Sequence, residues 1–291
     1  MPIRRIAEEP ASRLAIWARR IALFALAVAS LAIVIERLGL LEIVPVLTTF
    51  AAALAMALIA ILLALAALVG IWRHGVDGFG AVLTAIVIAV ALLGYPAYLG
   101  VLALRLPEIS DITTDPIDPP RYETIGRLRS RGANPIAYAG LYAAEQQKAA
   151  YPNITPLDTD ASAQTTYEAA MDAIAKRRWQ VINAREPQAA RPGVPARDGY
   201  IEAVARTLIM GFRDDIAVRI RAVGGGARVD VRSSSRYGRH DFGTNAARVR
   251  ALLDDIDDLA DKETPDPSEQ AAPQKQKPKQ PAPKPNPRTR R

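Results

Sequence analysis

The stretch from Arg232 to Asn245 combines residue types that bind anions. Its sequence, RSSSRYGRHDFGTN, joins small hydroxyl side chains, a turn with two glycines, and polar residues that can begin a helix. Backbone N–H groups at a helix start attract phosphate or carboxylate groups. We therefore predict a strand–turn–helix anion site here. The alternative is that Asp241, Thr244 and Asn245 only cap the helix and hold the turn.

Arginines on the preceding strands extend this candidate site. Side chains alternate between the two faces of a strand, so residues 200–210, 215–223 and 228–236 place six arginines and three acids on one face of a sheet. The excess of arginine predicts a docking surface for an anionic ligand or a partner protein. Cross-strand ion pairs on a solvated face are the alternative. The predicted binding residues of both regions are Arg206, Arg219, Arg232, Ser234, Arg236, Gly243 and Asn245.

The residues that could support catalysis form weaker patterns. Asp214 or Asp215 could act as an acid or base, but neighbouring residues on a strand point to opposite faces and form no close carboxylate pair. Ser235, His240 and Asp241 lack the spacing of a serine hydrolase motif. With no cysteine and only two histidines in the chain, we predict no metal, no cofactor and no catalytic residue.

Periodicity predicts the elements that position these residues. Apolar residues at helical spacing predict helices over 163–178 and 245–260, and alternation predicts strands over 179–185, 200–210, 215–223 and 228–236. Prolines in 107–120 favour an extended lead-in. The short connections between the strands predict an α+β domain, whose mainly antiparallel, four-stranded sheet has two flanking helices on one face.

Three apolar segments precede this domain. Residues 43–72 and 79–104 contain no charged side chain, and each is long enough to cross a bilayer; residues 21–35 form a shorter first span. The absence of charge inside the second and third spans favours an anchor over a transporter. Five arginines before the first span place the N-terminus in the cytoplasm. Three crossings then place the soluble domain on the opposite side.

The predicted domains have different compositions. They are a basic cytoplasmic N-terminus (1–20), a membrane domain (21–106), a soluble α+β domain (107–261) and a disordered Pro- and Lys-rich tail (262–291). The soluble domain has 21 basic and 22 acidic residues. This balance argues against binding of nucleic acid.

Motifs distributed along the soluble domain resemble a known family. They are ISDITTD from Ile109, YIEA from Tyr200, FRDDIAVR from Phe212 and VRSSSRYG from Val231, followed by Asp241, Gly243 and Asn245. In this order they are similar to the domain-of-unknown-function family 1499. The resemblance implies a bacterial, membrane-anchored protein and carries no established reaction.

The combined prediction is a multi-pass protein of the bacterial inner membrane with a periplasmic domain. Its expected partners are the lipid bilayer and an anionic envelope lipid, an envelope polymer or a partner protein. We predict a non-enzymatic binding module. The alternative is a hydrolase or transferase that modifies an envelope lipid or glycan.

Overall fold

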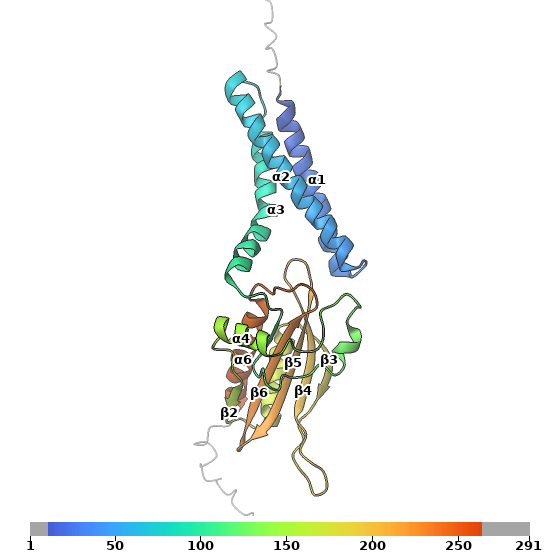
Figure 1. Ribbon diagram of the computed structural model, residues 1–291, viewed down its shortest axis with the longest axis vertical. Helices are drawn as coiled ribbons and strands as arrows, with labels where there is room; N and C mark the ends of the chain where they lie inside the picture. Colours follow the sequence, from blue (N-terminus) through green and yellow to red (C-terminus); the bar gives the residue numbers. More distant parts are fainter. Residues whose placement is uncertain (1–10, 264–291) are drawn as a thin grey trace, which may run out of the picture.

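Three long helices form one end of the molecule. The computed structural model describes residues 11–263, in which helices α1 (Arg13–Leu38), α2 (Ile43–His74) and α3 (Phe79–Arg105) pack together (Figure 1). All three are long and apolar enough to cross a membrane. Alanines form most of the buried interface, which brings the helix backbones close together. Large apolar side chains such as Phe24 and Leu104 point outward, as expected for helices surrounded by lipid.

The rest of the described chain forms a head domain around one antiparallel sheet. Its strands are β1 (Asp111–Thr113), β2 (Leu157–Thr159), β3 (Gln180–Arg185), β4 (Gly199–Arg206), β5 (Arg213–Val223) and β6 (Gly226–Ser235). The strand order is β1-β6-β5-β4-β3, and β2 also pairs with β6. The prediction of an antiparallel sheet is confirmed. The predicted number of four strands is wrong, because β1 and β2 are three-residue strands that are too short to show alternation.

Two helices cover one face of the sheet. Helices α5 (Ala163–Lys176) and α6 (Thr244–Glu263) pack on each other and on the strands. Ile201, Ile216, Val218 and Val229 project from the sheet into the main core between the layers. Both helices were predicted, whereas α4 (Leu141–Ala150) and the 3₁₀ helix η1 (Ile125–Leu128) were not.

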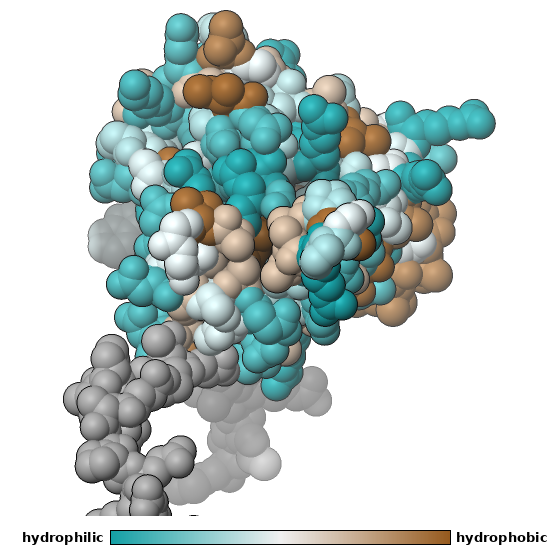
Figure 2. All heavy atoms as spheres, turned by 90° about the horizontal axis from the view of Figure 1, so that it is seen from below, coloured by the Kyte–Doolittle hydropathy of each residue, from teal (hydrophilic) through white to brown (hydrophobic). Residues whose placement is uncertain are grey.

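The other face of the sheet carries the predicted arginines and acids, but it is covered. Tyr122 and Ile125, from the segment before α4, pack against Tyr200, Val204 and Ala217 in a second core cluster. The expectation of an open, solvated face is therefore wrong for most of this surface. Figure 2 shows that the end of the head domain facing away from the helices is largely hydrophilic.

Both edges of the sheet differ from a regular exposed strand. At β1, the buried Gln147 side chain accepts a hydrogen bond from the Thr113 N–H at 3.0 Å and donates one to the Thr113 carbonyl at 2.7 Å. At β3, the register with β4 shifts between Val181 and Asn183. Such a bulge increases the local twist of a strand.

The head domain contacts the three long helices through the β4–β5 turn. Arg37, near the end of α1, donates to the carbonyls of Leu208 and Ile209, and Arg206 donates to the Arg37 carbonyl at 2.9 Å. Gly211 has φ 79°, and a Cβ there would lie 2.8 Å from Arg37 Cγ, so only glycine permits this approach. These reciprocal hydrogen bonds fix the turn against the end of α1.

The element bounds differ from the predictions at the chain ends. Helix α1 begins at Arg13, well before the predicted start of the first span, and α6 runs to Glu263, inside the predicted tail. Residues 1–10 and 264–291, which contain part of the predicted N-terminal region and nearly all of the predicted tail, lie outside the described residues.

Candidate functional site

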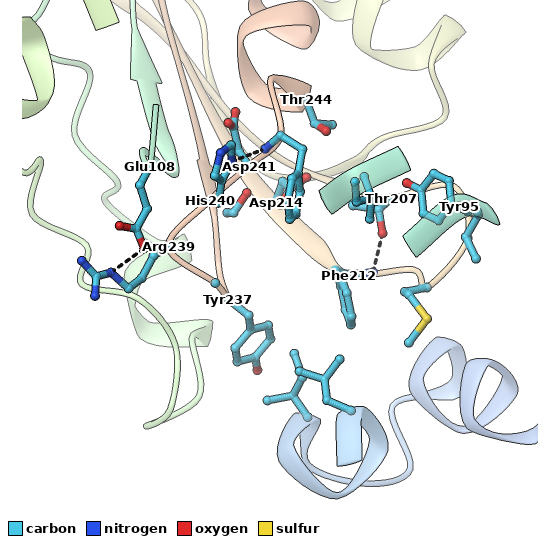
Figure 3. Close-up of a pocket in the computed structure, with 18 residues that line it drawn as sticks. Tyr95, Glu108, Thr207, Phe212, Asp214, Tyr237, Arg239, His240, Asp241 and Thr244 are labelled. Atoms are coloured by element: carbon cyan, nitrogen blue, oxygen red, sulfur yellow. Dashed lines mark hydrogen bonds and ion pairs between the residues drawn. The ribbon is translucent and has the colours of Figure 1, made fainter. Parts of the chain in front are cut away.

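A cavity of about 480 Å³ lies where α2 and α3 meet the head domain (Figure 3). We call it the junction cavity. Helix α2 contributes Ile43 and Leu47, and α3 contributes Tyr95 and Leu99. Each pair is four residues apart and so lies on one side of its helix. Leu99 is six residues before the end of α3, about 9 Å along the helix axis. The cavity therefore extends alongside the last turns of α3 and the first turns of α2, beyond the surface of the head domain.

The head domain completes the apolar part of the junction cavity. The β4–β5 turn contributes Ile209, Met210 and Phe212, and Phe242 approaches from the segment before α6. Met210 also packs with Ala32 and Val46 in a small core cluster that joins the turn to α1 and α2. The Phe212 N–H donates to Thr207 Oγ1 at 2.9 Å, which holds the turn in shape. The wall is thus formed by residues from both parts of the protein.

The opposite end of the junction cavity is polar. Figure 3 shows Glu108, Arg239 and His240 on one side and Thr207, Phe212 and Tyr95 on the other. Arg239 Nε lies 3.1 Å from Glu108 Oε1, and both side chains are more than half exposed. An exposed ion pair of this kind contributes at most about 1 kcal/mol. These two side chains can therefore move apart at low cost.

His240 is held in place by the backbone. Its Nδ1 accepts a hydrogen bond from the Phe242 N–H at 2.9 Å, which leaves Nε2 to donate to the Leu106 carbonyl at 3.1 Å. The imidazole also stacks on the Phe242 ring, with 4.7 Å between centroids. Both ring nitrogens are therefore committed to structural bonds at the point where α3 passes into the head domain.

Two buried carboxyl groups lie at the head-domain end of the cavity. Asp214 forms an ion pair with Arg248 at 2.6 Å, and Asp241 accepts the N–H groups of Gly243 and Asn245 at 3.0 and 2.9 Å. Burial raises the pKa of Asp214, against the opposing effects of Arg248 and a hydrogen bond with Ser235. Burial also raises the pKa of Asp241, against its two backbone hydrogen bonds.

The segment of the predicted strand–turn–helix site borders this cavity, but its predicted binding residues Ser234, Arg236, Gly243 and Asn245 do not line it. Ser235, Tyr237 and Gly238 line it together with Asp241 and Thr244. The amides of Gly243 and Asn245, proposed to bind an anion, donate to Asp241 in the structure. The Asp241 carboxyl group thus occupies the place at these amides that an external anion would take. An external anion at this turn stays a prediction.

Asn245 connects the turn to the sheet. Its amide donates to the Ser110 carbonyl and to Ser235 Oγ, and its Oδ1 accepts from Ser233 and Arg248. All of its side-chain hydrogen-bonding capacity is used within the protein. In this structure Asn245 therefore ties together β6, the lead-in to β1 and the start of α6.

The predicted arginines of the sheet face are separated from the junction cavity and paired internally. Arg232 is 2% exposed and binds both oxygens of Asp111, at 3.0 and 2.6 Å. Arg236 binds Asp215 Oδ1 at 2.7 Å, and Asp215 Oδ2 accepts from Arg129 at 2.7 Å. Arg129 also donates to Ser234 Oγ at 3.2 Å.

The remaining two arginines of the prediction lie nearer the surface. Arg219 contacts Asp118 at 2.7 Å and Asp230 at 3.1 Å, and Arg206 binds the end of α1. The structure therefore does not gather the predicted residues into one site. A role for these arginines in ligand binding remains a prediction.

Sequence reasoning did not identify the cavity residues of α2, α3 and the β4–β5 turn. In the sequence, Leu47 and Leu99 look the same as any other membrane-span residue. The one available signal was Ile209-Met210 beside Gly211-Phe212, an apolar run at a strand end where a polar turn is more usual.

Comparison with known families identifies the family of the head domain. The model of the family described as "Protein of unknown function (DUF1499)" matches residues 111–256, half of the chain. The chain belongs to the DUF1499 family. The matched DUF1499 region begins with β1 and ends within α6, so it contains the whole sheet and excludes α1 to α3. The resemblance found in the motifs is thereby confirmed.

Other comparisons add little to the DUF1499 assignment. No curated protein matches the chain. Among solved structures, it is similar to Ara h 8.0201 at 6% identity, covering 37% of this chain and 95% of that chain with a TM-score of 0.22. It is similar to CalU16 from Micromonospora echinospora at 12% identity, covering 36% and 83% with a TM-score of 0.17. Scores this low support no inference about the DUF1499 chain.

Proposed function

We propose that this chain is a membrane-anchored, non-enzymatic binding protein that holds an amphipathic lipid in its junction cavity. The observation that carries the proposal is the composition of the cavity, which has an apolar wall shared by α2, α3 and the β4–β5 turn and a polar end in the head domain. A lipid has the same division between an acyl part and a headgroup. The volume of about 480 Å³ lies within the usual range for ligand sites.

The position of the cavity supports a ligand that arrives from the bilayer. Its walls include Ile43 and Leu47 in the first turns of α2, and these turns are part of an apolar helix long enough to span a membrane. A lipid can therefore enter sideways without crossing water. This proposal retains the predicted strand–turn–helix region as part of the site and leaves the arginine face as structural support.

We further propose that the protein resides in a bacterial inner membrane with its head domain on the periplasmic side. The support is the excess of arginine before and within the start of α1, at the end of the helices remote from the head domain. In this arrangement the ligand is a lipid of the outer leaflet of that membrane.

Native mass spectrometry of the full-length protein tests the proposal. Leu47→Trp places a larger side chain in the cavity, so we expect it to lower the amount of lipid that remains bound after detergent extraction. Leu58→Trp is the matched control, because Leu58 is exposed on the same helix and does not line the cavity. Equal lipid retention by both variants and the wild type would contradict the proposal.

A second candidate function is an enzyme that modifies an envelope lipid, and one observation favours it. Asp214 lines the junction cavity, and its raised pKa is a property of general acids. Against this role, its carboxylate is paired with Arg248 at 2.6 Å. Asp215, the other predicted acid or base, binds two arginines and does not line the cavity. Loss of lipid turnover in Asp214→Asn with lipid binding retained would favour the enzyme.

A further inference from the structure

A second hollow in the head domain adjoins the polar end of the junction cavity. It has a volume of about 470 Å³, and its lining includes Ser110, Asn134, Tyr138 and Tyr142. We call it the tyrosine groove. Glu108 and Arg239 line both spaces. The two hollows are therefore neighbours, with this exposed ion pair between them.

The ion pair is a weak barrier between the two spaces. The Arg239 side chain is 84% exposed and the Glu108 side chain 55% exposed. Neither is held by a second ion pair within residues 11–263. Because both side chains line both spaces, a rotation that separated them would open the junction cavity toward the tyrosine groove, and one elongated ligand could then occupy both.

Apart from the Glu108–Arg239 pair, the described residues of the tyrosine groove offer hydrogen-bonding groups without a free charge. Asp111 lines it, but both of its oxygens are bound to Arg232, and Ser234 Oγ accepts from Arg129. A phosphate or carboxylate placed here would lack a cation apart from Arg239, and burial of an unpaired charge is strongly unfavourable. A neutral headgroup avoids this penalty.

Tyr138, which lines the groove, has a buried hydroxyl group without a partner among the described residues. Its ring is held under the Arg232 guanidinium, 5.7 Å from the ring centroid. Burial raises the pKa of Tyr138 to about 12, so the hydroxyl stays protonated and can donate. Tyr142, 74% exposed, provides a second aromatic surface beside it.

We propose that the ligand is a glycolipid, with its sugar headgroup in the tyrosine groove and the start of its hydrocarbon part in the junction cavity. A sugar carries many neutral hydroxyl groups, which suit the unpartnered Tyr138 hydroxyl, and apolar C–H faces, which suit an aromatic ring. This inference rests on the proposed lipid-binding function and specifies the class of lipid.

Competition between lipids tests the inference. Full-length protein in a polyoxyethylene detergent, which contains no sugar, receives equal amounts of monoglucosyl diacylglycerol, phosphatidylglycerol and phosphatidylcholine with identical acyl chains. Native mass spectrometry then reads which lipid is bound. We expect the glucosyl lipid to dominate. Tyr138→Phe, which removes only the hydroxyl, should reduce the preference about fivefold, the effect of one neutral hydrogen bond.

The variants test the groove, and the lipid preferences separate the two proposals. Tyr142→Ala should also lower the preference, whereas Leu141→Ala should not, because Leu141 is exposed on the same helix outside the groove. Binding of all three lipids to equal extents, or a preference for phosphatidylglycerol, would overturn the glycolipid assignment and leave the lipid-binding function standing. Binding of none would overturn both.

Discussion

Asp215→Asn tests whether the arginine face is a structural layer inside the head domain. Asp215 is completely buried between Arg129 and Arg236, whose side chains are 3% and 5% exposed and whose nitrogens lie 2.7 Å from its two oxygens. Asparagine keeps the shape of the side chain but removes the only negative charge that contacts these two arginines within residues 11–263. Two guanidinium groups then remain buried without a carboxylate.

We expect Asp215→Asn to lower the free energy of unfolding strongly, because burial prevents water from replacing the lost carboxylate. Breaking one buried ion pair costs about 3–5 kcal/mol. For a domain of this size, that corresponds to a decrease in melting temperature of about 6–20 °C. Asp118→Asn is the control. Asp118 also contacts an arginine at 2.7 Å, but its side chain is 56% exposed, and we expect a cost below about 1 kcal/mol.

Fluorescence can follow the head domain alone. The chain has three tryptophans, and Trp17 and Trp72 lie on α1 and α2. In a Trp17→Phe, Trp72→Phe background, Trp179 is the single reporter, and it packs against the main core of the head domain. Thermal unfolding of the detergent-solubilised protein then compares the variants. If Asp215→Asn lowers the melting temperature no more than Asp118→Asn does, the arginine face is not a buried structural layer.

Two further predictions concern packing and pH. Gly226→Ala should destabilise the head domain by about 1–3 kcal/mol, because a Cβ there would lie 2.1 Å from the Thr159 carbonyl oxygen, whereas Gly132→Ala, with open space around it, should have little effect on urea unfolding. Because burial raises the folded-state pKa of Asp241, its protonation favours folding. The stability of the wild type relative to Asp241→Asn should therefore be highest below about pH 4 and fall as pH rises through the folded-state pKa. A rise in relative stability over this range in calorimetry would contradict the assigned direction.

Local patterns were sufficient for the long elements of the fold. Ile216, Val218 and Ile220 alternate along β5, and they lie in the main core as the alternation predicts. The apolar spacing of Val249, Leu252 and Ile256 likewise predicts the buried side of α6. Such elements are recognised because each repeats one rule over many residues.

The covered sheet face depended on contacts that no local pattern reveals. Tyr122 lies 93 residues before Asp215 in the chain, yet its hydroxyl donates to the Asp215 carbonyl at 2.9 Å. The prolines in the preceding segment, 107–120, predict only an extended lead-in. In the structure the chain around Tyr122 instead forms a layer over the arginines. Alternation identified the face but could not show what covers it.

The junction cavity is even harder to predict from local sequence patterns. Its walls come from α2, α3, the β4–β5 turn and the segment before α6. The relative placement of these parts depends on contacts such as those of Arg37 with the turn. Sequence reasoning singled out the strand–turn–helix segment by its glycines and hydroxyl side chains, and Asp214 as a possible acid or base. None of the seven predicted binding residues lines the cavity.

The sheet edges have a particular consequence if the three long apolar helices hold the protein in a membrane, as we propose. Neighbouring copies in a bilayer diffuse in two dimensions with similar orientation, so exposed strands of adjacent heads would meet repeatedly. The Gln147 side chain already occupies the free N–H and carbonyl of Thr113, and the irregularity at Val181 interrupts the opposite edge. Both features hinder strand addition by another chain. The head domains can therefore crowd on the membrane surface without joining into a continuous sheet.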